Sequence, residues 1–239
     1  MIDIHSHILF GVDDGAQNRK ETQALLRTAH QQGVHTIIAT PHQRRGMFEA
    51  TREEIEERYA QVVAMAEKIS PNLKVLLGSE IYITQSTLER IEQGAYFPLG
   101  DSKALLVEFP YEIAYRDIQK AVKRISWAGY RVVLAHIERY EALDNHADRV
   151  EELLMLGCYT QINASSLLPI KLFDKKKQRK KRARYFLEQQ VVHFVASDVH
   201  NMTDRAYYMQ DAYLFLEKNY GRKVAADLCW RYQEKLLRG

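Results

Sequence analysis

Seven short apolar runs, rich in β-branched residues, alternate along this chain with longer amphipathic stretches. We interpret the runs as strands, at residues 2–4, 36–39, 75–77, 105–107, 132–135, 159–162 and 192–196. Strands that alternate with helices generally pair in parallel, and they are apolar on both faces because helices cover both. The pattern therefore restricts the chain to an α/β fold, either an open doubly wound sheet or a closed barrel.

The stretches between the runs have the spacing of apolar residues that helices show. They predict helices at residues 19–32, 52–69, 115–128, 148–156, 176–189, 204–219 and 222–237. Gly33, Gly129 and Gly157 follow three of these helices, as is typical of a helix C-terminus. No Gly-rich phosphate motif follows the first strand, so the sequence favours a seven-stranded (β/α) barrel of the TIM type. Without a linker or repeat, residues 1–239 form a single predicted domain.

Composition narrows the class of protein. The net charge of +3 is too small to indicate a partner, and no run is apolar and long enough to cross a bilayer. The chain opens directly into its first predicted strand, so we expect no secretory signal and a cytoplasmic protein. Two cysteines, Cys158 and Cys229, are too few for a disulfide framework and suit a reducing compartment.

Polar residues with metal-binding side chains follow the predicted strands, and in a barrel these positions converge on one rim. His5 and His7 come at the end of the first strand, where residues two apart point to the same side. The remaining histidines and acids at these positions are His42, Glu80, Glu108, His136, Asp198 and His200, and the acidic pair Asp13 and Asp14 follows the first strand. Taken alone, a residue such as Glu108 has a plain alternative as a helix cap or surface charge.

Together, five histidines and several carboxylates at one rim would stay unpaired or repel one another unless cations were bound. Imidazole and carboxylate without thiolate favour Mn²⁺, Fe or Zn²⁺ over a structural zinc site. The number of ligands exceeds the needs of one ion, which predicts two or three ions with Glu80 as a bridging ligand. Such ions can generate hydroxide from bound water at neutral pH and polarise a phosphoryl oxygen.

Seven motifs extend nearly from end to end: DIHSHILFGVDDG at 3–15, TPH at 40–42, GSEIY at 78–82, EF at 108–109, AHIERY at 135–140, QINASS at 161–166 and ASDVHN at 196–201. With these motifs the chain resembles the PHP (polymerase and histidinol phosphatase) superfamily. Within it, the chain is most similar to the manganese-dependent tyrosine-protein phosphatases of Gram-positive capsule and exopolysaccharide operons.

The resemblance implies a distorted barrel with a trinuclear metal cluster, with Mn²⁺ as the metal and Fe, Zn²⁺ or Mg²⁺ as other occupants. The implied metal ligands are His5, His7, Asp14, His42, Glu80, Glu108, His136, Asp198 and His200. It also implies that Arg139 and Arg205 hold the phosphate and stabilise the transition state. The choice of Asp14 over Asp13 rests on the resemblance alone, because spacing does not separate neighbours on a loop.

The implied activity is hydrolysis of phosphotyrosine on a bacterial tyrosine autokinase, regulating capsular or exopolysaccharide synthesis, by metal-activated hydroxide without a cysteinyl-phosphate intermediate. A thiol phosphatase would need an arginine six positions after its cysteine, but Ala164 and Lys235 occupy those positions. Two alternatives remain: a phosphatase of a small metabolite such as histidinol phosphate, and a non-enzymatic regulator that binds a kinase or nucleic acid.

A basic run at residues 175–184 has two interpretations. Most such runs are solvated helix faces. The alternative is docking onto an acidic, phosphotyrosine-bearing segment or an anionic membrane surface, with at most peripheral membrane association. No aromatic stacking motif accompanies the run, so no nucleic-acid partner is expected. The sequence leaves the oligomeric state undetermined.

Overall fold

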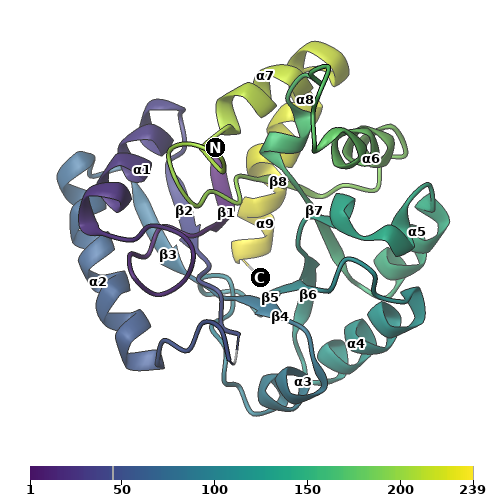
Figure 1. Ribbon diagram of the computed structural model, residues 1–239, viewed down its shortest axis with the longest axis horizontal. Helices are drawn as coiled ribbons and strands as arrows, with labels where there is room; N and C mark the ends of the chain where they lie inside the picture. The colour runs from purple at the N-terminus through teal and green to yellow at the C-terminus, as the bar shows by residue number, and fades with distance from the viewer. Residues whose placement is uncertain (45, 239) are drawn as a thin grey trace.

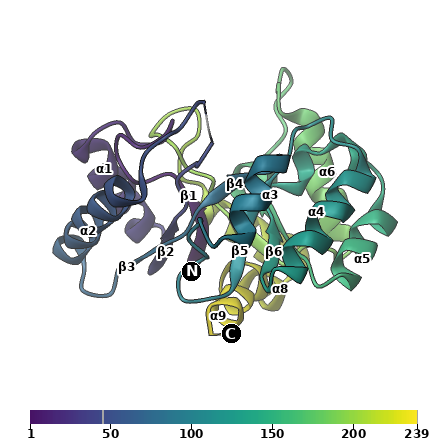
Figure 2. The same ribbon diagram turned by 90° about the horizontal axis from the view of Figure 1, so that it is seen from below.

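The computed structural model describes residues 1–44 and 46–238, so two residues of the predicted domain, Arg45 and Gly239, lie outside the described part. The strands occupy the middle of the molecule and the helices surround them (Figure 1). Seen from the side, the C-terminal helix and the N-terminus lie together at one end of the strands (Figure 2). Long connecting segments lie at the other end, where the carboxyl ends of the strands are found.

The described residues contain eight strands, all paired in parallel, in two sheets. The first sheet has the order β1 (Ile2–Ser6), β2 (Thr36–Ala39), β3 (Lys74–Leu77). The second has the order β4 (Glu80–Tyr82), β5 (Ala104–Glu108), β6 (Arg131–Leu134), β7 (Tyr159–Asn163), β8 (Phe194–Ala196). All seven predicted strands are confirmed within a few residues, and β4 is an additional strand.

The helices are α1 (Arg19–Gln31), α2 (Arg52–Ile69), α3 (Gln85–Glu92), α4 (Tyr115–Trp127), α5 (Ala147–Met155), α6 (Lys177–Glu188), α7 (Met209–Tyr220), α8 (Arg222–Ala226) and α9 (Tyr232–Arg238). A π-helical turn at Asp227–Arg231 connects α8 to α9. The predicted helices are present, although α7 begins five residues later than expected, at Met209 instead of 204, and α3 was not predicted. Gly33, Gly129 and Gly157 each have a positive φ at a helix end, as predicted. Among the described residues, no helix has the length and apolar character needed to traverse a bilayer.

The predicted closed seven-stranded barrel is not found among the described residues. Only isolated bridges connect the two sheets, one between Ser6 and Val199 and one between His42 and Glu80. The break between β3 and β4 falls at Gly78, where the backbone passes so close to its neighbours that a Cβ would lie 3.0 Å from the Leu99 side chain. The chain therefore leaves the first sheet at this glycine and enters the second sheet at Glu80.

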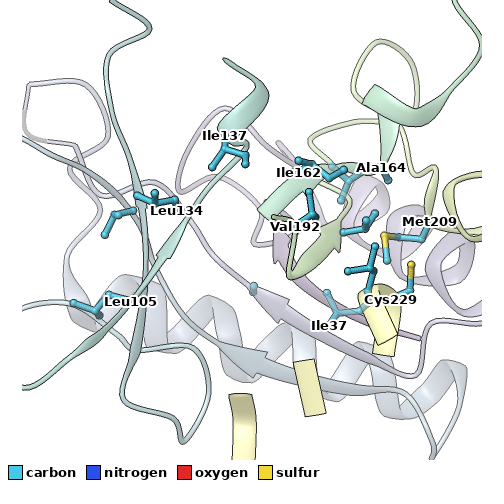
Figure 3. Close-up of a cluster of buried hydrophobic side chains, with 14 of the residues drawn as sticks. Ile37, Leu105, Leu134, Ile137, Ile162, Ala164, Val192, Met209 and Cys229 are labelled. Carbon is cyan, nitrogen blue, oxygen red and sulfur yellow. The ribbon is translucent and has the colours of Figure 1, made fainter. Parts of the chain in front are cut away.

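The strands are buried on both faces, as the apolar runs predict. Neighbouring residues of β2 illustrate this, because Ile38 packs in an inner cluster with Leu106 and Phe194, whereas Ile37 packs in a larger outer cluster. Part of the outer cluster is drawn in Figure 3, where side chains of strands, helices and loops meet. Leu236 of α9 joins the inner cluster. Apolar side chains thus fill the space between the strands at that end, and polar residues gather at the other.

Candidate metal centre

Each of the nine predicted metal ligands lies at or near the carboxyl end of a strand, except Glu80, which opens β4. His5 lies in β1, His42 follows β2, and Glu108 is the last residue of β5. His7, Asp14, His136, Asp198 and His200 lie in the loops that follow β1, β6 and β8. All but Asp14, His42 and Glu108 are almost fully buried. The structure therefore brings the predicted residues together at one rim, from six separate strands and the loops that follow them.

The carboxylate of Glu80 lies at the middle of this cluster. Its Oε2 atom lies 3.1 Å from His5 Nε2, 3.1 Å from His7 Nε2 and 3.2 Å from His42 Nδ1. Its Oε1 atom lies 2.9 Å from His136 Nε2. Burial would raise the pKa of Glu80, but the charges of His5 and His42 outweigh burial and hold that pKa well below its usual range. Glu80 is therefore a buried, ionised carboxylate surrounded by four imidazoles.

The potential ligand atoms form three overlapping groups, each with all its atoms within 4.8 Å of one another. The groups are His7, Asp14, His42 and His200; His5, His7, Glu80 and Asp198; and His42, Glu80 and Glu108. Every two groups share one residue, namely His7, His42 or Glu80. Groups linked in this way would suit neighbouring cations with shared ligands, and Glu80 is common to two of the groups.

His136 and Glu108 complete one side of the cluster. His136 Nε2 lies 3.6 Å from Glu108 Oε2. Burial, with the charge of Arg139, lowers the pKa of His136 to about 3, so this imidazole is neutral and can act as a ligand. Burial and the nearby charge of Glu80 raise the pKa of Glu108 to about 8. A carboxylate oxygen of Glu80 and one of Glu108 lie within 4.8 Å of each other. Two carboxylates this close resist joint ionisation, which is the condition that a divalent cation relieves.

The residues present fit a set of divalent cations. Glu80 Oε2 and His200 Nε2 are buried atoms without a hydrogen-bond partner among the described residues. A buried polar atom without a partner is destabilising unless something else satisfies it. The donors are imidazole nitrogen and carboxylate oxygen, the set that suits Mn²⁺, Fe or Zn²⁺ in catalytic sites. Both cysteines are buried in the hydrophobic core, outside this donor set.

Asp13 and Asp14 have different surroundings. Asp13 is buried and accepts hydrogen bonds from His7 Nδ1 at 2.7 Å, from Gly15 N at 2.9 Å and from His42 N at 2.9 Å. Asp14 is half-exposed, and its Oδ1 lies 3.3 Å from His200 Nε2 and 3.5 Å from His42 Nε2. Asp13 therefore fixes the orientation of His7, with its Nε2 free to face the cluster, whereas Asp14 faces the cluster itself.

Arg139 and Arg205 both bind the carboxylate of Asp198. Arg139 Nη2 donates to Oδ2, and Arg205 Nη2 donates to Oδ1 at 2.8 Å. Burial raises the pKa of Asp198, but the charges of Arg139, His5 and Arg205 more than offset it and keep the carboxyl ionised. Asn163 Nδ2 donates to the same Oδ2 at 2.6 Å. The two guanidinium groups predicted to hold phosphate thus lie at the edge of the histidine–carboxylate cluster.

Two of the predicted ligands have a left-handed backbone, with φ of 35° at His136 and 51° at Asp198. Residues other than glycine rarely adopt this conformation, because the Cβ atom then crowds the backbone. Hydrogen bonds to adjacent strands hold both residues in place. His136 N donates to Gln161 Oε1 of β7 at 2.8 Å, and Asp198 N donates to His5 O of β1 at 2.9 Å. Strain of this kind concentrates at functional sites.

Sequence reasoning did not identify several residues that orient the cluster. Gln161 accepts from His136 N, and its Oε1 lies 3.2 Å from His5 Nδ1, which leaves His5 Nε2 free to face Glu80. Gln161 and Asn163 are polar residues at alternate positions of the buried strand β7, and this alternation was the signal available in the sequence. Lys176 was counted only within the basic run. Burial and the charges of Arg139 and Arg205 lower the pKa of Lys176, so it lies near those arginines.

Comparison with known proteins identifies related sequences. A family model described as capsular polysaccharide synthesis, CpsB/CapC, matches residues 1–238. Tyrosine-protein phosphatase CpsB of Streptococcus pneumoniae is 48% identical to this chain over 229 residues, covering 95% of this chain and 94% of that protein. Tyrosine-protein phosphatase YwqE of Bacillus subtilis (strain 168) is 34% identical over 224 residues, covering 94% of this chain and 87% of that protein.

Two solved structures are informative. One, described as YwqE from Bacillus subtilis and CpsB from Streptococcus pneumoniae, unique metal-dependent tyrosine phosphatases, has a TM-score of 0.87 and 33% identity, covering 100% of this chain and 94% of that chain. Histidinol phosphate phosphatase from Lactococcus lactis, in complex with zinc, L-histidinol and phosphate, has a TM-score of 0.60 at 15% identity, covering 95% of each chain. At that identity the second likeness shows a shared fold alone.

Proposed function

The chain belongs to the CpsB/CapC family of capsular polysaccharide synthesis proteins, and on this premise we propose that it is a metal-dependent protein-tyrosine phosphatase. The observation that carries the proposal is the buried rim cluster, in which four histidines and four carboxylates form three ligand groups with shared members. A fifth histidine, His136, lies 2.9 Å from Glu80 and 3.6 Å from Glu108. Relatives at 48% and 34% identity are named tyrosine-protein phosphatases, and they match nearly the whole chain. Cluster and relatives therefore support the same chemistry.

The nine predicted ligands are proposed to hold two or three ions, with Mn²⁺ as the metal. Glu80, His7 and His42 would each serve two ions, because each belongs to two ligand groups. When bound, such ions supply polarisation of a phosphoryl oxygen and a water whose pKa falls from about 15.7 toward about 7. Asp13 and Gln161 orient the imidazoles of His7 and His5 through hydrogen bonds to their Nδ1 atoms, on the side away from the proposed ions.

Arg139 and Arg205 are assigned to the phosphoryl group of the substrate. A guanidinium group carries a permanent charge and a planar fork of donors that matches phosphate oxygens. Arg139 is largely buried, and the negative charge of Asp198 outweighs burial and raises the pKa of Arg139. Both arginines donate to the carboxylate of Asp198, so their other guanidinium N–H groups lie beside the ligand groups. A phenolate leaving group has a pKa of about 10, so its departure needs little help from a general acid.

A cysteine-based route has no support among the described residues. Cys158 and Cys229 are both almost fully buried in the hydrophobic core. Burial raises the pKa of Cys229 to about 12 and raises that of Cys158 further above its ordinary range. A thiol is nucleophilic only as the thiolate, and neither thiol ionises near neutral pH. The chemistry is therefore assigned to the rim cluster.

The substrate is proposed to be a phosphotyrosine-bearing segment of a bacterial tyrosine autokinase, and the process the synthesis of capsular or exopolysaccharide. The description of the family supports the process, and the names of the relatives support phosphotyrosine on a protein as the substrate group. The autokinase is what the resemblance of the sequence motifs implies. The alternative substrate, a small phosphomonoester such as histidinol phosphate, is supported only by likeness of fold. A purely binding role would leave the buried histidine–carboxylate cluster without a purpose.

One comparison tests the proposal. The purified full chain, loaded with Mn²⁺ and analysed for metal content, is assayed on a phosphotyrosine peptide, the matching phosphoserine peptide and histidinol phosphate. We expect the highest kcat/KM on the phosphotyrosine peptide and loss of turnover after chelation. A higher kcat/KM on histidinol phosphate would assign the chain to metabolite hydrolysis, and full activity in the chelated protein would overturn the metal mechanism.

A further inference from the structure

A second cationic cavity lies beside the metal centre. We name it the arginine pocket: a cavity of about 420 Å³ lined by Arg44, Arg52 and Arg90 together with Phe48, Thr51 and Ser86. Its volume lies within the range of about 300–1,000 Å³ that ligand pockets usually have. The three arginines come from different parts of the chain, namely the loop after β2, the first residue of α2, and α3. None of them was singled out by the sequence motifs.

Each guanidinium group in the pocket lies over an aromatic ring. Arg44 lies 3.9 Å from the centroid of Tyr82 and Arg52 lies 4.0 Å from that of Phe97. Arg90 lies 5.1 Å from the centroid of Tyr96. Contact with a ring face restrains a guanidinium group without using its N–H donors. The three side chains are therefore held in place with donors free to bind a ligand.

The positive charge of the pocket is largely uncompensated. Arg44 and Arg90 form no ion pair within residues 1–44 and 46–238. Arg52 approaches Glu56 at 3.3 Å, in a pair exposed enough to be weak. Glu49 is the acidic residue that lines the pocket, and its Oε1 accepts a hydrogen bond from Gly46 N at 2.7 Å. Three guanidinium groups against one carboxylate leave a net positive cavity.

The beginnings of two helices also line the pocket. Thr51, the N-cap residue of α2, lines the pocket, as do Ser86 and Thr87 in the first turn of α3. The N-terminus of a helix carries a partial positive charge, because its first N–H groups have no partner within the helix. Helices α2 and α3 lie on adjacent sides of the molecule (Figure 1), and residues at the start of each line the pocket. In α2 this charge is offset by Glu53 and Glu54 in the first turn, whereas the first turn of α3 has no acidic residue. The N-terminus of α3 is therefore the helix end that favours an anion.

The pocket adjoins the metal centre through a single side chain. Phe48 lines the pocket, and its ring stacks on the imidazole of His42 with centroids 5.2 Å apart and an interplanar angle of 9°. The backbone of Gln43, another pocket residue, pairs with the backbone of Glu80. A peptide with one residue at the metal centre can therefore reach the pocket with a nearby residue.

We propose that the arginine pocket binds a second anionic side chain, a carboxylate or a phosphate, of the same peptide whose phosphotyrosine occupies the metal centre. The proposal rests on the proposed phosphatase function and names a feature of its substrate: negative charge close to the phosphotyrosine. Stacked arginine forks and the N-terminus of α3 suit carboxylate and phosphate alike. The pocket would act through substrate binding, so we expect it to lower KM for a peptide with a second anion and to leave kcat unchanged.

The test uses the metal-loaded full chain and three peptides. Each peptide has one phosphotyrosine. In the first peptide the flanking residues are uncharged, and in the second they are glutamates. In the third, a flanking residue is a non-hydrolysable phosphonate analogue of phosphotyrosine. The variant Arg90→Glu reverses an exposed charge of the pocket, and Arg222→Glu makes the same change on the exposed surface of α8 as a matched control. Arg90→Gln, which removes charge without reversing it, separates a lost contact from added repulsion. Thermal unfolding checks that every variant is folded.

We expect the second anion to raise kcat/KM of the wild type by about tenfold through a lower KM, equivalent to about 1.4 kcal/mol. The glutamate and phosphonate peptides show whether carboxylate or phosphate is preferred. Arg222→Glu should keep the gain, Arg90→Gln should reduce it and Arg90→Glu should abolish it. All variants should hydrolyse p-nitrophenyl phosphate, which has no second anion, at the wild-type rate.

Two failures are distinguishable. A wild type that turns over all three peptides equally, or an Arg90→Glu variant that keeps the gain, overturns the pocket and leaves the phosphatase function intact. A wild type that hydrolyses none of the peptides overturns the phosphatase function. In that case calorimetry with a peptide carrying two phosphonate groups still decides the pocket, because Arg90→Glu should weaken its binding by about tenfold and equal binding would refute the site.

Discussion

Asp13 and Asp14 are neighbours in the sequence, yet they make different contacts. Asp13 accepts three hydrogen bonds and orients His7, while Asp14 faces His42 and His200. Spacing along a loop contains no information on which side chain turns inward, so the sequence alone left the two unresolved. The residue predicted from the resemblance, Asp14, lies among the ligand groups. The supporting role of Asp13 became visible only from its burial and its partners.

This difference predicts different effects of the same substitution. Asp13→Asn removes the charge that orients His7, and it should weaken Mn²⁺ binding by about 10–100-fold, the usual loss when an outer partner of a ligand is changed. Asp14→Asn removes a ligand of one group among three, so we expect one ion fewer per chain. Calorimetric titration and elemental analysis measure both. Asp211→Asn on the exposed face of α7 is the control, and wild-type affinity in Asp13→Asn would contradict the role given to Asp13.

The two cysteines allow a test of the catalytic group. Because burial keeps both thiols protonated, we expect native protein treated with iodoacetamide to retain its phosphatase activity. The variants Cys158→Ser and Cys229→Ser should keep most of it, whereas His136→Ala should abolish turnover, because His136 lies 2.9 Å from Glu80 within the cluster. Initial rates on a phosphotyrosine peptide provide the measurement. Inactivation by the alkylating agent in still-folded protein would point back to a thiol nucleophile.

At the scale of elements, periodicity and helix-stop glycines predicted every long helix and seven strands. The two missed elements are short and adjacent. Strand β4 has three residues and follows Gly78 and Ser79, which in a sequence indicate a turn. Helix α3 has eight residues and begins at a capping box formed by Thr84 and Thr87 instead of the more common glutamate. Both elements matter for function, since β4 opens with Glu80 and α3 carries Arg90.

The basic run at 175–184 is divided by the structure. Lys175, Lys177 and Lys181 are exposed, as expected of a solvated helix face. Lys180 is buried instead, and its Nζ atom lies 2.9 Å from Pro169 O and 2.7 Å from Asp174 Oδ2. Arg182 lies 2.9 Å from Asp144. Part of the run therefore anchors α6 to its neighbouring loops, a role that charge patterning alone does not indicate.

Adjacent lysines of α6 provide a matched pair for this anchoring role. Lys180→Ala removes a buried cation and leaves Pro169 O without its donor, so we expect the Tm to fall by about 2–4 °C, which corresponds to a modest loss of stability in a chain of this size. Lys181→Ala changes an exposed side chain and should leave the Tm within about 1 °C of the wild type. Differential scanning calorimetry compares them. Equal Tm values for the two variants would show that α6 does not depend on Lys180.

At the scale of the whole molecule, the sequence predicted that separated strand ends meet at one rim, and the structure brings all nine predicted ligands there. This part was predictable because parallel topology alone places strand ends on one side. The absence of a closed barrel was not predictable from the sequence, because closure depends on the local backbone geometry between neighbouring strands. Gly78 allows the close approach at which the first sheet ends, and single bridges between Ser6 and Val199 and between His42 and Glu80 replace continuous pairing. The arginine pocket was equally invisible, because Arg90 lies in α3, a helix that the sequence did not predict.

Because the rim cluster joins both sheets, bound metal should stabilise the entire fold. Glu80 belongs to the second sheet, whereas His5 belongs to the first. A ligand at 100 times its Kd stabilises the native state by about 2.7 kcal/mol, which for a chain of this length raises the Tm by about 5–10 °C. Thermal unfolding of chelated protein, with and without added Mn²⁺, measures the shift.

Glu80→Gln distinguishes a specific shift from a general effect of salt. This variant keeps the volume of the side chain but removes the charge shared by two ligand groups, so most of the Mn²⁺-dependent rise in Tm should disappear. The chelated variant should itself unfold earlier than the chelated wild type, because the imidazoles that hold the pKa of Glu80 below its usual range lose their charged partner. The comparison therefore uses the Mn²⁺-dependent rise in Tm within each protein. A Tm rise of equal size in wild type and Glu80→Gln would show that the ions bind elsewhere, and the two sheets would then be held together by packing alone.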